Sequence, residues 1–516
     1  MPLSTVNDWT SLAARLGLEP LGPVPADLPD GWLLRLEDKA RHLARHREEA
    51  GFRVQLGEVV EEEPHYAAVA RHCVYTDALE DALRARLLHE YGARRRWLEV
   101  WLRQCVLRRI AADPVVLERV GRIEHTMWRV LAEPLPTDTH AMVQAQTQRQ
   151  QALSALVRDD LLALVERRNE LARGEGVRTY HALACAYNDS PEDVLWPIFD
   201  QLRDATDRPM AALAEWLRDR EGTPFETLAA MNGAARRHLT LPNDSLPPVD
   251  REALARANAA MGLPDWGIPH ELSVAPFGMG GLCSGIDALE DVRIVVSDKL
   301  TRQTALGCLY HEYGHALHGA AMARAGHPFH LGTMLLGEPG PVCEMLAMLL
   351  ESVMFDRDWI ADVTLLDGDA LDQWALRARW SELRVARIHL QWAYFERALY
   401  DDPRQDFDAL ARRLDRELLG LEPSPGEPAA WAANPLFVSV PGYCHTYLAA
   451  QIGVHQLREA IGEPLWGNTE VGPWLARHFW EPAATIPWRS RVEAATGQPY
   501  GPEAFMRRLA IAALPR

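Results

Sequence analysis

The 516-residue sequence lacks the features of disulfide-stabilised, membrane-spanning and exported proteins. It has only seven cysteines, an odd number with no Cys-x-x-Cys pair, so we do not expect a disulfide framework. No run of about 18 apolar residues occurs, so no transmembrane helix is predicted. The first residues, Met1 to Asp8, contain neither a basic region nor an apolar core. We therefore expect a cytoplasmic protein that does not contact membranes.

Positive charge is also scarce. The chain has 54 Lys and Arg against 72 Asp and Glu, which gives a net charge of −18 at pH 7. Such a balance argues against nucleic acid or an anionic membrane surface as the main partner. Hydrophobic residues make up 48% and charged residues 24%, which is typical of a globular protein with a large core.

The pattern that is present is mainly helical. Apolar residues recur at spacings of three and four through most of residues 27–239, with few β-branched runs. The Pro-rich segment 241–248 reads as a linker. We therefore predict an N-terminal helical lobe over 1–245 and a catalytic region over 246–516. The predicted elements that later matter are helices over 78–110, 142–170, 370–400 and 406–419, and a strand over 292–296.

The chemistry is concentrated in residues 309–318, which contain a His-Glu-x-x-His motif. Thr301 can cap the start of a helix here and Gly326 can end it. Residues four apart share one face of a helix, so His311 and His315 can present their imidazoles to one metal ion, with Glu312 beside them. This spacing is typical of zinc hydrolases, and we predict one Zn²⁺ per chain.

A second helix, predicted to open at Pro341, supplies further candidates. Glu344 lies among apolar residues, where a carboxylate is costly unless it is paired or binds a cation, so we predict it as the third zinc ligand; the alternative is a salt-bridged carboxylate. Glu351, on the same face, either holds the second ring nitrogen of a ligand histidine or forms an ordinary ion pair. His318 also falls on the zinc face, but we expect a hydrogen-bonded helix histidine there, because the metzincin pattern requires a glycine at that position.

These residues resemble a known family. The sequence His-Glu-Tyr-Gly-His-Ala-Leu-His, followed by a helix with Glu344 and Glu351, is similar to the thimet oligopeptidase and oligopeptidase F family of gluzincin metallopeptidases. Residues 282–285 and 291–294 are similar to the corresponding segment of the angiotensin-converting enzymes. The resemblance implies a largely helical fold of two lobes around a deep substrate channel, with a few short β-strands beside the zinc site. It also implies that Ser284 and Gly285 lie on a strand edge that binds an extended peptide.

A tyrosine pair follows near residue 443. Gly442-Tyr443-x-x-x-Tyr447 is similar to the segment that, in the thimet oligopeptidase family, lends phenol donors to the reaction intermediate. Packing is the alternative role for tyrosines at this spacing. The family's histidine before the tyrosines is missing, and His445 could substitute for it. We expect Tyr447 to donate to the oxyanion and Tyr443 to act mainly on substrate binding.

These observations predict a zinc-dependent oligopeptidase that hydrolyses short peptides, with Glu312 as general base. No Lys or Arg occurs over 428–447, where angiotensin-converting enzymes place a lysine for the substrate carboxylate, so the pattern of a dipeptidyl carboxypeptidase is incomplete. A second hypothesis is a biosynthetic metallohydrolase that acts on one small amide or peptide-like metabolite. A third is a helical scaffold with a degenerate zinc site, which the intact ligand set disfavours.

Overall fold

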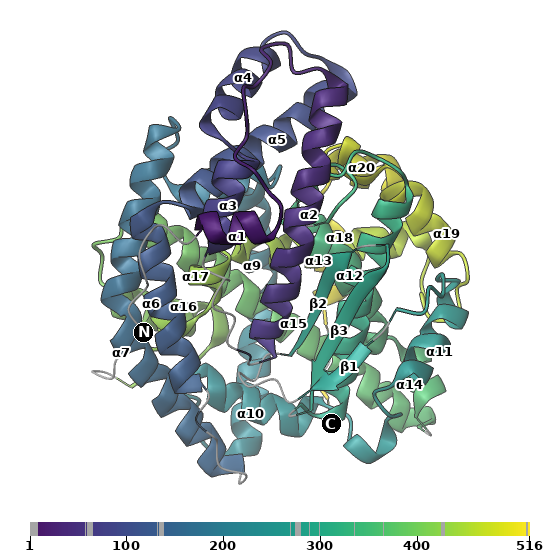
Figure 1. The fold of residues 1–516 in the computed structure, drawn as a ribbon. Helices are drawn as coiled ribbons and strands as arrows, with labels where there is room; N and C mark the ends of the chain where they lie inside the picture. The colour runs from purple at the N-terminus through teal and green to yellow at the C-terminus, as the bar shows by residue number, and fades with distance from the viewer. Residues whose placement is uncertain are drawn as a thin grey trace.

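The protein is mainly α-helical, as predicted (Figure 1). The structure is a computed structural model, and it describes residues 9–56, 58, 65–131, 133, 139–268, 270–273, 280–287, 289–298, 300–334, 336–364, 366–424, 429–511 and 514–515. These residues form 21 α-helices and three short strands. Within this part of the chain, no helix combines the length and the apolarity needed to cross a membrane.

Eleven helices precede the strands. They are α1 (Trp9–Arg15), α2 (Asp30–Gln55), α3 (Tyr66–Cys73), α4 (Asp77–Leu87), α5 (Gly92–Ala111), α6 (Pro114–Leu131), α7 (Thr139–Gly174), α8 (Tyr180–Tyr187), α9 (Glu192–Glu221), α10 (Leu228–Leu239) and α11 (Arg251–Met261).

Ten helices follow the strands. They are α12 (Arg302–Arg324), α13 (Gly340–Glu351), α14 (Arg357–Val363), α15 (Gly368–Asp401), α16 (Phe407–Leu419), α17 (Leu436–Ser439), α18 (Cys444–Ile461), α19 (Val471–Leu475), α20 (Trp488–Thr496) and α21 (Glu503–Leu509).

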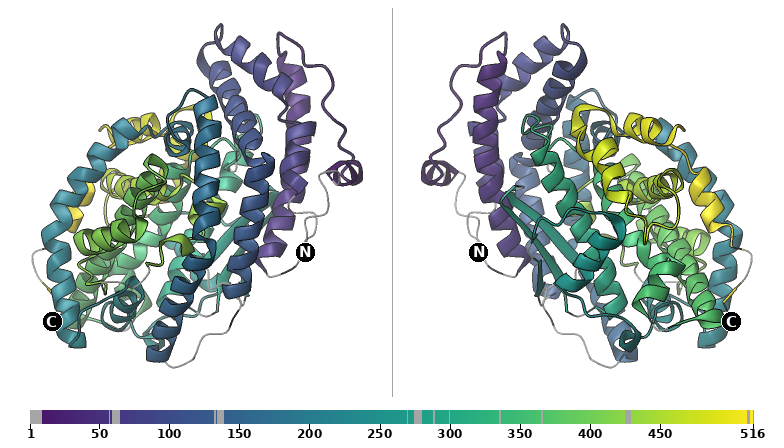
Figure 2. Two further views of the ribbon diagram at one scale, coloured as in Figure 1. Left: turned by 90° about the vertical axis from the view of Figure 1, so that its left-hand side faces the viewer. Right: turned by 90° about the vertical axis from the view of Figure 1, so that its right-hand side faces the viewer.

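The three strands form one small sheet beside α12. The strands are β1 (His270–Ser273), β2 (Gly281–Asp287) and β3 (Asp291–Ser297), in the order β1-β3-β2. β3 confirms the strand predicted over 292–296; it runs parallel to β1 and antiparallel to β2. Helix α2 lies along β2, and the right-hand view of Figure 2 shows this purple helix beside the teal strands.

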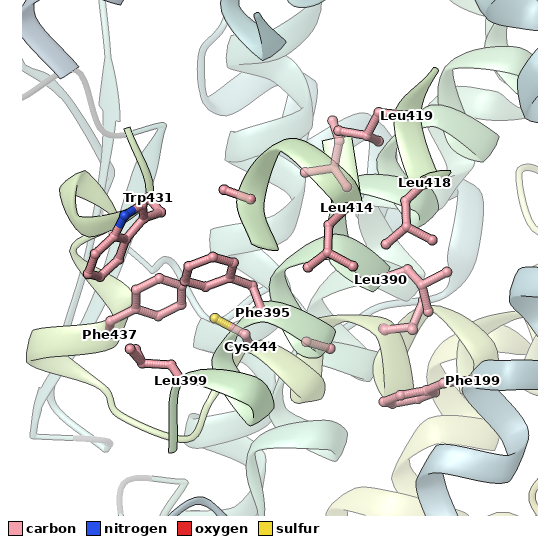
Figure 3. Close-up of a cluster of buried hydrophobic side chains, with 14 of the residues drawn as sticks. Phe199, Leu390, Phe395, Leu399, Leu414, Leu418, Leu419, Trp431, Phe437 and Cys444 are labelled. Atoms are coloured by element: carbon pink, nitrogen blue, oxygen red, sulfur yellow. The ribbon is translucent and has the colours of Figure 1, made fainter. Parts of the chain in front are cut away.

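The cores join distant parts of the chain. One core combines residues between 106 and 239 with residues between 380 and 452. Figure 3 shows part of it, where the Phe395 and Phe437 rings stack with centroids 5.6 Å apart. A second core lies under α12 and α13 and takes in residues from 241 to 371 and from 450 to 492. The proposed division at residue 245 stays a prediction about domains.

Several predicted helix limits agree with the structure. The helices expected over 142–170, 370–400 and 406–419 are α7, α15 and α16. The helical stretch expected over 78–110 consists of two helices, because α4 ends at Leu87 and α5 begins at Gly92, whose φ of 60° lies in the left-handed region. That conformation suits glycine and interrupts a right-handed helix.

Candidate metal centre

Helix α12, which carries the motif, begins and ends near the predicted residues. The Thr301 side chain accepts a hydrogen bond from the backbone N–H of Thr304 at 3.3 Å, as an N-cap does. The helix ends at Arg324, two residues before Gly326, whose φ is 76°. The face opposite the motif is buried, and it consists of Leu306, Leu309, Ala316, Leu317 and Ala320. The two motif histidines are therefore fixed on the other face of a helix held by its core.

A glycine inside the motif brings α13 against α12. A Cβ atom placed on Gly314 would lie 2.6 Å from Cα of Ala347 and 3.1 Å from the carbonyl oxygen of Leu346. Such distances are far below ordinary van der Waals contact, so only glycine allows this helix separation. α13 opens with Pro341 in its first turn, as expected. The close approach brings Glu344 to the histidine pair.

Three side-chain atoms converge at this point. His311 Nε2 lies 3.2 Å from His315 Nε2 and 3.3 Å from Glu344 Oε2, and the third distance, from His315 Nε2 to Glu344 Oε2, is 3.8 Å. A zinc ion with bonds of about 2.0–2.1 Å in tetrahedral geometry separates its ligand atoms by about 3.3–3.4 Å. The three atoms are therefore spaced as ligands of one such ion.

The ionisation state and the hydrogen bonding of Glu344 also suit a metal ligand. Its Oε2 atom is buried and has no hydrogen-bond partner among the described residues, and a buried unpaired carboxylate oxygen is costly. Burial raises the pKa of this carboxyl, but His311, His315 and Tyr443 outweigh the effect and lower it to about 2. Glu344 is thus ionised, with one oxygen open toward the histidines.

Two further side chains orient His311 and Glu344. His311 Nδ1 lies 3.0 Å from Glu351 Oε2, which favours a proton on Nδ1 and leaves Nε2 as the electron-pair donor. The Tyr443 hydroxyl donates a hydrogen bond to Glu344 Oε1 at 2.7 Å. The contact between Glu351 and His311 is one of the two roles expected for Glu351. The hydrogen bond from Tyr443 to Glu344 was not expected from the sequence.

Glu312 lies between α12 and strand β2. A Cβ on Gly281 would lie 2.8 Å from Glu312 Cγ and 3.0 Å from its Oε1 atom, so the glycine leaves room for this side chain. Burial raises the pKa of Glu312 to about 7; His311 lowers it, and Glu344 and Glu351 raise it further. A bound cation would shift it down again, because the opposite charge favours the ionised form. In the absence of a bound cation, the carboxyl can exchange a proton near neutral pH.

The tyrosines lie beside this group, but His445 does not. The Tyr447 ring is 5.6 Å from the Tyr443 ring, and its pKa is held well above the usual value by burial, with the nearby charges of Glu344 and Glu312 adding to the effect. His445 is fully buried elsewhere. Its Nδ1 atom lies 3.7 Å from the sulfur of Cys185. The helical turn that aims Tyr443 and Tyr447 at Glu344 points His445 the other way.

The predicted substrate residues lie on strand β2. Ser284 pairs with Arg293 and Gly285 with Val292 of β3. Since β2 ends the sheet order, its other edge pairs with no described strand. The edge position agrees with the expectation, and the role of these two residues in binding peptide stays a prediction.

His318 lies outside the converging group of His311, His315 and Glu344, and its expected hydrogen bond is absent from the part of the chain that the structure describes. Both of its ring nitrogens are buried without a hydrogen-bond partner among the described residues. The nearest carboxylate oxygen, Glu338 Oε1, is 3.8 Å away and is bound by Arg491. The expected hydrogen bond is wrong, because this carboxylate oxygen lies beyond hydrogen-bond distance of the ring.

The sequence did not point to His389. This residue of α15 places its ring 5.3 Å from that of Tyr447, and its Nδ1 atom lies 2.9 Å from Gln451 Oε1. Burial lowers the pKa of His389 to about 4, although the charges of Glu351 and Glu344 raise it, so the imidazole is neutral. A lone histidine in a long amphipathic helix carries no local signal of such a position.

Comparisons with known proteins show the fold. No family model and no curated protein sequence matches the chain. A solved structure of a protein provisionally named oligoendopeptidase F matches with a TM-score of 0.69 and 14% sequence identity, over 97% of this chain and 94% of that chain. At this identity the match is evidence for a shared fold. The chain thus has an oligopeptidase-like fold over nearly its whole length.

Proposed function

We propose that the protein is a zinc-dependent peptidase that hydrolyses short peptides. The observation that carries the proposal is the convergence of His311 Nε2, His315 Nε2 and Glu344 Oε2 at distances of 3.2–3.8 Å, with the carboxylate oxygen otherwise unpaired. The fold shared with a protein named as an oligopeptidase supports a peptide as the substrate.

The residues divide the work by position. Zn²⁺ bound by the two histidines and Glu344 would supply Lewis-acid polarisation of the scissile carbonyl and acidify a water molecule. Glu312 accepts the proton of the attacking water and returns it to the leaving amine. Glu351 fixes the ring of His311, and Tyr443 fixes the carboxylate of Glu344. Tyr447 is the phenol left to donate to the oxyanion.

Strand β2 provides a place for an extended substrate. Its Ser284–Gly285 segment lies on the sheet edge, next to Gly281, which contacts Glu312. A peptide that adds to a strand edge is held by backbone hydrogen bonds, which make few demands on its sequence. We therefore expect many short peptides, rather than one, to be substrates.

The test combines metal analysis with digestion of a mixed peptide library followed by mass spectrometry. We expect bound zinc and cleavage of many short peptides. If the protein binds zinc but cleaves none of the peptides, the result would favour the alternative, a metallohydrolase that acts on one small amide or peptide-like metabolite. A protein that binds no zinc would refute both enzymatic proposals.

We predict that Tyr443→Phe weakens zinc binding by about 10 to 100-fold, because it removes the hydrogen bond that orients Glu344 Oε1. Competition with a chromophoric chelator measures the affinity. Tyr500→Phe is the matched control, since it removes a partly buried phenol that donates a hydrogen bond at 2.8 Å to the carbonyl oxygen of Ala449 on α18. Unchanged zinc affinity with a raised KM would return Tyr443 to a role in substrate binding.

We predict a different result for Tyr447→Phe. A phenol that donates to the developing oxyanion matters in the transition state, so kcat should fall by about 10² to 10³-fold while KM and zinc content change little. Steady-state kinetics on any cleaved peptide gives the two constants. A small effect on kcat would assign Tyr447 to packing against His389 and Tyr443.

A further inference from the structure

A second group of metal-binding side chains lies outside the proposed active site. His181 and Cys185 are one turn apart on α8, and His445 lies in the first turn of α18. All three are fully buried, and one ligand atom from each lies within 4.8 Å of the others. The proposed peptidase reaction uses none of them.

The distances suit a thiolate-bound ion. Cys185 Sγ lies 3.9 Å from His181 Nε2 and 3.7 Å from His445 Nδ1. With Zn–S of about 2.3 Å and Zn–N of about 2.0–2.1 Å, sulfur and nitrogen ligands are about 3.5 Å apart in tetrahedral geometry and about 3.8 Å apart in a trigonal plane. The observed separations match the trigonal value.

Neighbouring carboxylates prepare the group for a cation. Glu192 Oε1 lies 2.6 Å from His181 Nδ1, an arrangement that leaves Nε2 as the donor atom facing the sulfur. Glu396 is fully buried nearby, and it accepts hydrogen bonds from the backbone N–H groups of Gly442 and Cys444 at the start of α18. A divalent cation bound to one thiolate keeps a net positive charge, which these two carboxylates can balance.

Hydrogen bonding alone satisfies the group poorly. A neutral thiol is only a weak donor and a weak acceptor, so its contacts with the two imidazoles at 3.7–3.9 Å contribute little. An ion between the three side chains would engage all of them.

We propose that His181, Cys185 and His445 form a second metal site, which binds a thiophilic divalent cation such as Zn²⁺ and ties α8 to the start of α18. Binding replaces the thiol proton, which is released to solvent. Since α18 follows directly on Tyr443, the ion fixes the segment from which both tyrosines project. The site is independent of the proposed catalytic centre.

Cobalt substitution tests the proposal, because the catalytic ligands are nitrogen and oxygen only. The full-length protein is stripped of metal and titrated with Co²⁺, and a sulfur-to-cobalt charge-transfer band in the near ultraviolet is expected at the second site. Cys185→Ala should abolish the band, whereas His311→Ala, which disables the first site, should keep it. Cys105→Ala is the matched control, since this fully buried cysteine belongs to neither metal group.

The outcomes are distinct for the two sites. Two ions per chain by metal analysis, with the band lost only in the Cys185 variant, support the second site. Absence of the band in the unmodified protein, or its persistence in Cys185→Ala, overturns it. If Cys185→Ala does not fold by circular dichroism, His181→Asn decides: a band that it leaves unaltered also overturns the proposal. Failure of zinc to bind His311 and His315 would leave the band in place and contradict only the proposed function.

Discussion

Glu312→Gln is expected to keep zinc and fold while kcat falls by about 10² to 10⁴-fold. The amide has nearly the shape of the carboxylate, so it fits the space beside Gly281. It cannot, however, accept a proton from the attacking water. Zinc content, circular dichroism and steady-state kinetics on a cleaved peptide measure the three quantities.

His311→Ala provides the contrast. It removes one of the three converging atoms and the contact with Glu351, so zinc and turnover should be lost together. If Glu312→Gln lost zinc to the same extent, the division between metal ligands and general base would be refuted.

Gly314→Ala is expected to separate α12 from α13 and to weaken zinc binding. Its Cβ would lie 2.6 Å from Ala347 Cα, which is backbone and cannot rotate away. Forcing an extra methyl group into such a contact destabilises a protein by roughly 1–3 kcal/mol. Because Glu344 lies one turn from Ala347 on the displaced helix, zinc affinity should fall with stability. Urea unfolding and chelator competition measure the two effects.

Gly319→Ala is the matched control on the same helix. A Cβ at Gly319 meets no atom within 4 Å, so the substitution only replaces a poor helix former by a good one. It should stabilise the protein by up to about 1 kcal/mol and leave zinc affinity unchanged. If both variants behaved alike, close packing at Gly314 would not be what sets the helix separation.

The local part of the site was predictable from the sequence. A cap at Thr301, a glycine at the end of α12 and the spacing of His311 and His315 act within one helix, so their signals are complete in a short segment. Glu344 was accessible to the same reasoning because a lone carboxylate in an apolar helix needs a partner.

The long-range part was not predictable. The contact of Tyr443 with Glu344 joins residues 99 positions apart, and that of His445 with Cys185 joins residues 260 apart. Periodicity tells which residues share a face of one helix, but it does not tell which helices meet. The sequence therefore associates His445 with the neighbouring tyrosines, although its ring contacts His181 and Cys185 of α8.

Helix α18 contributes to both large cores, and this affects the order of events during synthesis. Leu448 and Ile452 belong to the core shared with residues 106–239, whereas Val454 and Leu457 belong to the core under α12 and α13. The ribosome releases this helix well after the proposed zinc ligands, so neither core can close around a nascent chain that ends before it. We expect that such a chain already carries His311, Glu312, His315 and Glu344 but cannot hold them in place. If the protein is the peptidase proposed above, its activity would then appear only after α18 has been synthesised.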